Sequence, residues 1–204
     1  MSTIPQPMRS RILRLRKWQD VHACVYGKLL LKRILNDFDL DLPLEKLKYS
    51  EFQRPYFEVD GFDFNISHSN CCVVCAGSTE TKLGVDIELM TEIHLDDLKS
   101  QFHPQEWRQV YYSEDKLSTF YRYWTRKEAL IKADGRGLQI SLAEIDVSKE
   151  NIEVVIGETN WSLLDIDLMD KYKCALASTK SDLNLKISEI NPRIFLVKDF
   201  AKDF

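Results

Sequence analysis

Residues 120–138 read FYRYWTRKEALIKADGRGL, and this stretch decides how the second half of the chain folds. We predict that it forms the C-terminal part of a long helix over residues 114–134. Gly135 stands where a left-handed C-cap residue is favoured, and Gly137 follows it, so the helix should end there. Strand patterns flank this helix on both sides. These short alternating or apolar runs cover residues 62–66, 71–76, 84–88, 152–156, 160–166 and 172–178.

Further helical patterns complete the order of elements. A long helix is predicted over residues 8–37, and short helices over residues 95–102 and 106–112. A chain of 204 residues with 44% hydrophobic residues suits one domain or two closely packed halves. The mixture predicts an α+β fold, divided into residues 1–83 and 84–204.

Charge and cysteine usage limit the classes of function. The net charge of −4 and the pI near 5.6 argue against general binding of nucleic acid. Five cysteines without an export signal predict reduced thiols in a cytoplasmic protein, and the apolar runs are too short to span a membrane. Residues 9–17 nevertheless carry five basic side chains and no acidic one. They form either a solvated helix face or a basic surface for a phosphate-bearing ligand or an acidic partner.

The helix over residues 114–134 places two charged side chains one turn apart. Glu128 and Lys132 are i,i+4 neighbours in the favourable orientation, which stabilises a helix by only about 0.2–0.5 kcal/mol. A surface ion pair is one explanation of this spacing. Trp124, one turn before Glu128, indicates instead that the stripe is partly sheltered. A half-buried carboxylate followed by a lysine would suit a site for a metal ion and a phosphate group.

Asp86 and Glu88 form a second candidate site. Side chains alternate along a strand, so these two carboxylates point the same way. An exposed pair would be solvated, whereas a buried pair would need a cation. Mg²⁺ is commonly held by one or two carboxylates together with substrate phosphates. The motif is therefore consistent with a polar strand face and with a metal site.

Residues 64–69 read FNISHS and offer a third candidate. His68, at the end of a strand and between two serines, can donate a hydrogen bond to a phosphate oxygen. Alternatively, the serines satisfy the backbone of a local turn. Cys72 and Cys75, in the next strand, have the spacing of a metal motif. Their thiols would point to opposite faces and no second ligand pair follows, so we predict buried apolar cysteines.

Taken in this order, the motifs resemble the Sfp-type 4′-phosphopantetheinyl transferases. The matching segments are FNISHS (64–69), LGVDIE (83–88) and FYRYWTRKEALIKADGRGL (120–138). The last is the most specific, because the family pattern has an aromatic residue, Trp, Lys-Glu, three residues, Lys and a Gly-x-Gly-Leu tail. Weaker similarity at residues 20–30 and 53–55 extends the resemblance to about residues 10–180. It implies two pseudo-symmetric α/β halves with coenzyme A bound in the cleft between them.

The resemblance also assigns roles around the metal. Asp86, Glu88 and Glu128 would be ligands of Mg²⁺, or of Mn²⁺ in its place. Lys132 would contact the pyrophosphate of coenzyme A, which is the substrate.

The implied nucleotide contacts lie in the first half. His68 would contact phosphate oxygens, Ser67 would border the nucleotide, Arg54 would lie near the adenosine, and Arg11 would reach the nucleotide.

The chain departs from the family pattern at the nucleotide. Gln53 and Arg54 replace a Gly-Lys pair, and arginine is not equivalent to lysine. Ala23 and Cys24 stand where relatives often carry Arg, Ser or Thr near the 3′-phosphate.

The implied reaction is an attack by a serine of an acyl or peptidyl carrier protein on the β-phosphorus of coenzyme A, releasing 3′,5′-ADP. Glu128 is our hypothesis for the general base, with Glu88 or a metal-bound water as alternatives. The basic residues 9–17 could steer an acidic carrier. We expect a monomer that binds neither nucleic acid nor a membrane. The rival hypotheses are a coenzyme A or nucleotide sensor and another Mg²⁺-dependent phosphoryl enzyme.

Overall fold

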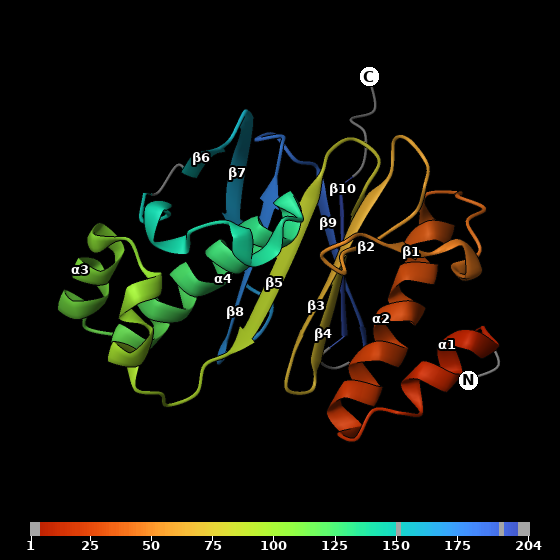
Figure 1. The fold of residues 1–204 in the computed structure, drawn as a ribbon, viewed down its shortest axis with the longest axis horizontal. Helices are drawn as coiled ribbons and strands as arrows, with labels where there is room; N and C mark the ends of the chain where they lie inside the picture. The colour runs from red at the N-terminus through yellow and green to blue at the C-terminus, as the bar shows by residue number, and fades with distance from the viewer. Residues whose placement is uncertain (1–4, 150–151, 192–193, 200–204) are drawn as a thin grey trace.

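Two helix-and-sheet units lie side by side in the computed structural model, which describes residues 5–149, 152–191 and 194–199 (Figure 1). In the first unit, α2 (Trp18–Asp37) covers a sheet with the order β3 (Asp63–Ser69), β4 (Cys72–Ser78), β10 (Ile194–Asp199), β9 (Leu185–Asn191). In the second unit, α4 (Lys116–Asp134) covers a sheet with the order β5 (Leu83–Leu89), β8 (Tyr172–Ser178), β7 (Thr159–Asp165), β6 (Ile152–Ile156). The predicted α+β fold is confirmed.

Smaller elements surround these units. They are α1 (Gln6–Ile12), the paired strands β1 (Lys48–Tyr49) and β2 (Pro55–Tyr56), α3 (Pro104–Tyr112), and 3-10 helices at Leu44–Lys46, Leu95–Gln101, Gly137–Gln139 and Leu142–Glu144. The single helix that we predicted over residues 8–37 is wrong, because the chain breaks between α1 and α2. Residues 13–17 are all exposed, so no buried contact supports a helix there, and the stability of helices in proteins comes mostly from such packing. No helix of the described residues is long and apolar enough to cross a membrane.

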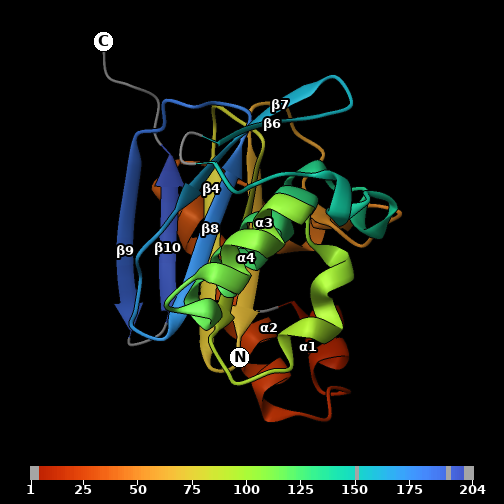
Figure 2. The ribbon, with the colours of Figure 1, turned by 90° about the vertical axis from the view of Figure 1, so that its left-hand side faces the viewer.

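The strands β9 and β10 were not predicted, and they return to the first sheet. β10 pairs in parallel with β4, from Ile194 opposite Val73 to Asp199 opposite Ser78, and β9 pairs antiparallel with β10. Figure 2 shows both strands at one edge of the molecule. Our division at residues 83 and 84 assigned them to the second half, whereas the pairing places residues 185–191 and 194–199 in the sheet of the first.

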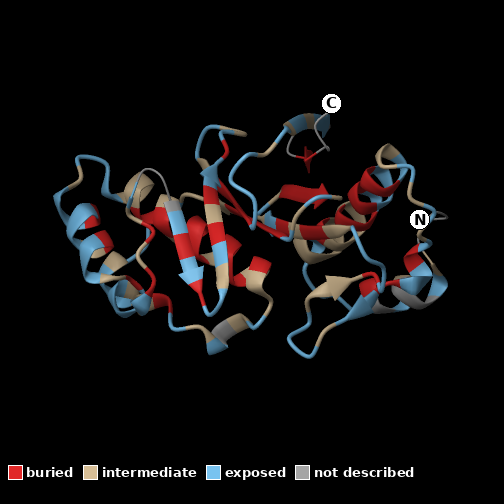
Figure 3. Cartoon of the chain, turned by 90° about the horizontal axis from the view of Figure 1, so that it is seen from above, coloured by how far each residue is buried: buried red, intermediate tan, exposed pale blue. Residues whose placement is uncertain are grey.

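Figure 3 shows that buried residues run through the helices and strands of both units. The buried hydrophobic residues of the described ranges form three clusters. One lies between α2 and the first sheet, and one between α4 and the second. The third joins strand faces that point away from the helices, and it includes Val74 of β4 and Val85 of β5. Cys75 belongs to the α2 side and Cys72 to the third part, so the predicted buried cysteines on opposite faces are confirmed.

The approach of α4 to β5 depends on a glycine. A Cβ atom on Gly84 would lie 2.2 Å from the carbonyl oxygen of Ala129 and 2.4 Å from the backbone nitrogen of Ala133. The helix backbone therefore rests directly on this strand. The helix then ends at Gly135, whose φ of +87° is left-handed, as predicted. These two glycines fix where α4 lies and where it stops.

Candidate active site

The two units meet at a seam, which is formed by the adjacent edge strands β3 and β5 and is bridged by side chains. Alternate β3 side chains accept hydrogen bonds from alternate β5 backbone N–H groups. The pairs are Asp63 with Leu83 at 2.9 Å, Asn65 with Val85 at 3.1 Å, Ser67 with Ile87 at 3.3 Å, and Ser69 with Leu89 at 3.0 Å. Buried N–H groups without partners are costly, so this ladder both satisfies β5 and sets the register between the units.

The carboxylates of Asp86 and Glu88 point from β5 toward the same side, as predicted. Asp86 is 2% exposed. Its Oδ1 accepts hydrogen bonds from the Ser67 hydroxyl at 2.9 Å and from the Lys132 ammonium at 2.5 Å. Its buried Oδ2 has no hydrogen-bond partner within the described residues. Glu88 Oε2 accepts a hydrogen bond from Ser69 Oγ at 2.6 Å.

Glu128 and Lys132 project from α4 toward these carboxylates. Lys132 pairs with Asp86 of β5 within the same unit, so it is not simply a surface partner of Glu128. Burial, and then the Asp86 and Glu88 charges, raise the pKa of Glu128, while the Lys132 ammonium opposes the rise. Burial and the Asp86 charge also raise the pKa of Glu88, against the hydrogen bond from Ser69. The three carboxylates thus share one partly desolvated region and repel one another.

This region fits a divalent cation in part. Within the described ranges, no group of three or more His, Cys, Asp or Glu side chains is gathered closely enough to hold a metal ion. The unpaired Oδ2 of Asp86 and the mutual repulsion of the carboxylates nevertheless fit a cation. Mg²⁺ usually combines one or two carboxylates with phosphate oxygens, so a complete protein cage is not required.

Two further charges of the α4 motif face the core, and the sequence did not reveal them. Lys127 is fully buried, pairs with Glu106 at 3.0 Å, and donates hydrogen bonds of 2.6 Å to two backbone carbonyls. Burial lowers the pKa of Lys127 and raises that of Glu106. Arg126 makes two hydrogen bonds to Asp165, at 2.7 and 2.6 Å. These contacts hold the side of α4 opposite the seam.

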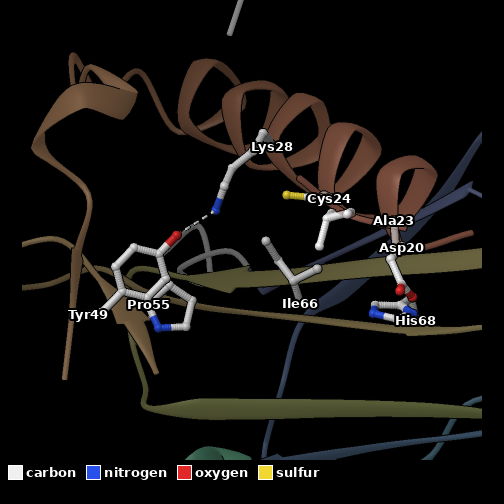
Figure 4. Close-up of a pocket in the computed structure, with 10 residues that line it drawn as sticks. Asp20, Ala23, Cys24, Lys28, Tyr49, Pro55, Ile66 and His68 are labelled. Atoms are coloured by element: carbon white, nitrogen blue, oxygen red, sulfur yellow. Dashed lines mark hydrogen bonds between the residues drawn. The ribbon is translucent and has the colours of Figure 1, made fainter. Parts of the chain in front are cut away.

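A cavity of about 520 Å³ lies between α2 and β3 (Figure 4). Its wall combines Ala23 and Cys24 of α2 with Ile66 and His68 of β3. Lys28 reaches across it to the hydroxyl of Tyr49, at 3.5 Å. This volume lies within the usual range of small-molecule sites, and the wall is largely apolar with a few polar groups.

His68 connects the cavity to the charged region. Partial desolvation, and then the Lys132 ammonium, lower the pKa of His68, although Asp20 and Asp86 oppose the change. A second cavity of about 230 Å³ shares Pro55 and Ile66 with the first and includes Lys132 in its wall. The two cavities therefore lead from α2 to the end of α4.

The predicted nucleotide residues have different surroundings. Ser67 is buried in the seam and accepts a hydrogen bond from Lys132 at 2.8 Å. The guanidinium of Arg54 makes two hydrogen bonds to Asp63, at 3.0 and 2.7 Å, and donates to the carbonyl oxygens of Lys132 and Leu83. Arg54 thus holds the two units together, and its contact with adenosine stays a prediction. The side chain of Arg11 lies outside the described part of the structure.

Comparison with known proteins identifies the family. A sequence model of the 4′-phosphopantetheinyl transferase superfamily matches residues 82–177. The 4′-phosphopantetheinyl transferase gsp of Aneurinibacillus migulanus is 29% identical, over 99% of this chain and 90% of that protein. Sfp of Bacillus subtilis (strain 168) is 26% identical over 94% and 89%. HetI of Nostoc sp. (strain PCC 7120) is 32% identical over 74% and 68%. This chain belongs to the Sfp-type 4′-phosphopantetheinyl transferase superfamily.

Proposed function

We propose that this 4′-phosphopantetheinyl transferase moves the phosphopantetheine arm of coenzyme A to a serine of an acyl or peptidyl carrier protein, with the help of Mg²⁺ or Mn²⁺. The observation that carries the proposal is the group of Asp86, Glu88, Glu128 and Lys132, in which one oxygen of Asp86 is buried and unpaired among the described residues. Lys132 of this group lines a cavity that shares Pro55 and Ile66 with the larger cavity, whose size suits part of a nucleotide.

Asp86, Glu88 and Glu128 would hold the cation. When bound, it would supply positive charge that stabilises the negative charge developing on the phosphate groups during transfer. In this structure the Lys132 ammonium donates a hydrogen bond to Oδ1 of Asp86. Its flexible ammonium would turn to a phosphate oxygen of coenzyme A, where a second positive charge stabilises the same transition state.

The cavity beside α2 would hold the nucleotide end of coenzyme A. His68 borders this cavity and is close enough to Lys132 for that ammonium to lower its pKa. A phosphate placed between the two side chains would accept hydrogen bonds from both. Ala23 and Cys24 supply no positive charge here, so Lys28 is the basic side chain of this wall that could reach a phosphate.

Glu128 would act as the general base. The carrier serine Oγ would bond to the β-phosphorus of coenzyme A, and the bond from this phosphorus to the bridging oxygen would break. The electron pair would leave with 3′,5′-ADP, and the serine proton would pass to the Glu128 carboxylate. Burial raises the pKa of this carboxyl, which makes it a better proton acceptor than an ordinary glutamate.

The carrier would approach the turn between α1 and α2. Leu13 is 72% exposed and Trp18 is 60% exposed, and Arg14, Arg16 and Lys17 lie exposed between them. An apolar and basic surface next to the cavity suits an acidic carrier. Neutralising the three basic residues should lower the transfer rate at low salt and flatten its salt dependence. An unchanged salt dependence would exclude this surface.

The proposal is tested by the intact mass of several apo carrier proteins after incubation with the enzyme, coenzyme A and Mg²⁺. We expect one added phosphopantetheine on at least one carrier, and its loss with EDTA or with Glu128→Ala. A protein that binds coenzyme A tightly but modifies no carrier would be a coenzyme A sensor on the same fold.

A further inference from the structure

The seam ladder has two kinds of acceptor. Near its start, Asp63 and Asn65 accept hydrogen bonds from β5 through carboxylate and amide oxygens. Near its end, Ser67 and Ser69 use hydroxyl groups, which can accept one hydrogen bond and donate another at the same time. The change from acceptor-only oxygens to hydroxyls occurs where β5 carries the site carboxylates.

Each serine hydroxyl joins the β5 backbone to a neighbouring carboxylate. Ser67 accepts from Ile87 N–H and donates to Asp86, while Ser69 accepts from Leu89 N–H and donates to Glu88. The hydroxyl of Ser67 also accepts a hydrogen bond from Lys132. A substitution of Ser67 would therefore disturb Lys132 and Asp86 at the same time. Ser69 has the simpler geometry, because its hydroxyl links one backbone N–H to one carboxylate oxygen.

Glu88 needs such a partner. It follows the buried part of β5 and is only half-buried, and its side chain has three rotatable bonds. The 2.6 Å hydrogen bond from Ser69 anchors the carboxylate to the same strand edge that fixes the Glu88 backbone. Partners of this kind orient ligands, and their loss typically costs about 10- to 100-fold in metal affinity or activity.

We propose that Ser69 is a positioning residue that fixes the carboxylate of Glu88 for cation binding, by bridging it to the Leu89 N–H group across the seam. The inference rests on the proposed function for its effect on transfer. It also makes a separate prediction for cation binding, which is measured without a carrier protein and without transfer.

The chain offers a matched control in Ser78. Its buried hydroxyl donates a hydrogen bond to Asp199 at 2.9 Å and accepts one from Glu80 N–H at 2.9 Å. Ser78 therefore has the same kinds of hydrogen bond as Ser69, at the opposite end of the antiparallel pair β3 and β4. Ser78→Ala removes the same two kinds of hydrogen bond, but at a place remote from Asp86, Glu88 and Glu128. Any effect that both variants share is therefore structural.

The experiment compares Ser69→Ala with Ser78→Ala, and Ser69→Val with Ser69→Thr, which have the same shape but differ in the hydroxyl. Mn²⁺ affinity of each purified enzyme is measured by electron paramagnetic resonance with coenzyme A present, and transfer is measured against Mg²⁺ concentration. We expect Ser69→Ala and Ser69→Val to need about 10- to 100-fold more cation in both measurements. Ser69→Thr should stay close to the unmodified enzyme, and Ser78→Ala should lose thermal stability only.

Equal Mn²⁺ affinities for Ser69→Val, Ser69→Thr and the unmodified enzyme would overturn the inference and leave the proposed function intact. Absence of transfer by the unmodified enzyme would instead overturn the proposed function. The Mn²⁺ measurement would still decide the role of Ser69 in that case. If Ser69→Ala did not fold, the Val and Thr pair would give the answer.

Discussion

The two long helices occupy similar places in the two units but present different chemistry. α2 turns Ala23, Cys24 and Gly27 toward a cavity, so this unit supplies space and an apolar wall. α4 turns Glu128 and Lys132 toward two carboxylates of β5, so this unit supplies concentrated charge. A helix resting on a sheet therefore does not by itself determine a role. The few side chains that face the cavity or the carboxylates determine it.

The helices also differ in how they are held. The buried side of α2 is aliphatic, with Leu30, Leu31 and Ile34 in the core. α4 adds the buried pair of Lys127 and Glu106 to its apolar contacts. A buried pair of this kind stabilises little by itself, but the loss of one partner is costly, which restricts the orientation of the helix.

The largest effect should come from removing the charge of Glu128. Glu128→Gln keeps the shape of the side chain but cannot accept the serine proton. We expect the single-turnover transfer rate at saturating coenzyme A to fall by about 10²- to 10⁴-fold. Coenzyme A binding, measured by calorimetry, should persist. Glu153→Gln, on the exposed edge of β6, is the control, and unchanged turnover in Glu128→Gln would remove Glu128 as the base.

The second prediction compares a glycine in each unit. Gly84→Ala places a Cβ against the backbone of α4, whereas Gly77→Ala meets the side chain of Ile34, at 2.6 Å. Backbone atoms yield less readily than a side chain, so we expect a loss of about 3 kcal/mol for Gly84→Ala and about 1 kcal/mol for Gly77→Ala. Urea denaturation measures both. Turnover should also fall more in Gly84→Ala than in Gly77→Ala. Equal losses of stability and turnover in the two variants would show that the backbone contact of α4 with Gly84 constrains the fold no more than the side-chain contact at Gly77.

The third prediction tests the cavity beside α2 independently of the charged side chains. Cys24→Phe fills part of the cavity beside α2 without changing any charge. The KM for coenzyme A should rise by about 10-fold, as a loss of about 1.4 kcal/mol in binding would produce, while kcat should change far less. Steady-state kinetics with a fixed carrier protein measures both. A fall in kcat with unchanged KM would mean that the nucleotide lies elsewhere.

The smallest effect concerns stability and pH. The pKa of Glu128 is raised above its ordinary value of 4.5, so the ionised carboxylate costs folding free energy. This cost is fully present above the folded-state pKa and disappears below the unfolded-state pKa. In metal-free protein, Glu128→Gln should therefore raise Tm at pH 7 by about 2–4 °C, and the gain should shrink as the pH falls toward 4.5.

Thermal denaturation with EDTA, from pH 4.5 to 7.5, measures this gain. Glu153→Gln should show none. A gain that grew on acidification would have the wrong sign and would contradict the raised pKa of Glu128.

Local patterns in the sequence predicted much of this arrangement. The period of two placed Asp86 and Glu88 on one side of a strand, and Gly135 marked the end of α4. The α+β class followed from the order of such patterns. In each case the information lies within a few neighbouring residues, because strand alternation and helix capping are local properties.

Partners that are distant in the sequence were not predictable in this way. No pattern in the sequence indicated that Lys127 would pair with Glu106, or that Ser69 would donate a hydrogen bond to Glu88. Arg54 was assigned to the nucleotide by its motif, yet its hydrogen bonds hold the two units together. Periodicity indicates which way a side chain points, and only the packing of separate elements decides what it meets.

The return of β10 to β4 has a consequence for the order in which the molecule can form. Ser78 and Asp199, which hydrogen bond to each other, are 121 residues apart in the chain. During synthesis, α2, β3 and β4 emerge early, but the first sheet must wait for residues 194–199 before β4 gains its second neighbour. Closing such a long loop slows folding. The unit built on α2 should therefore be completed last, although its helix is made first.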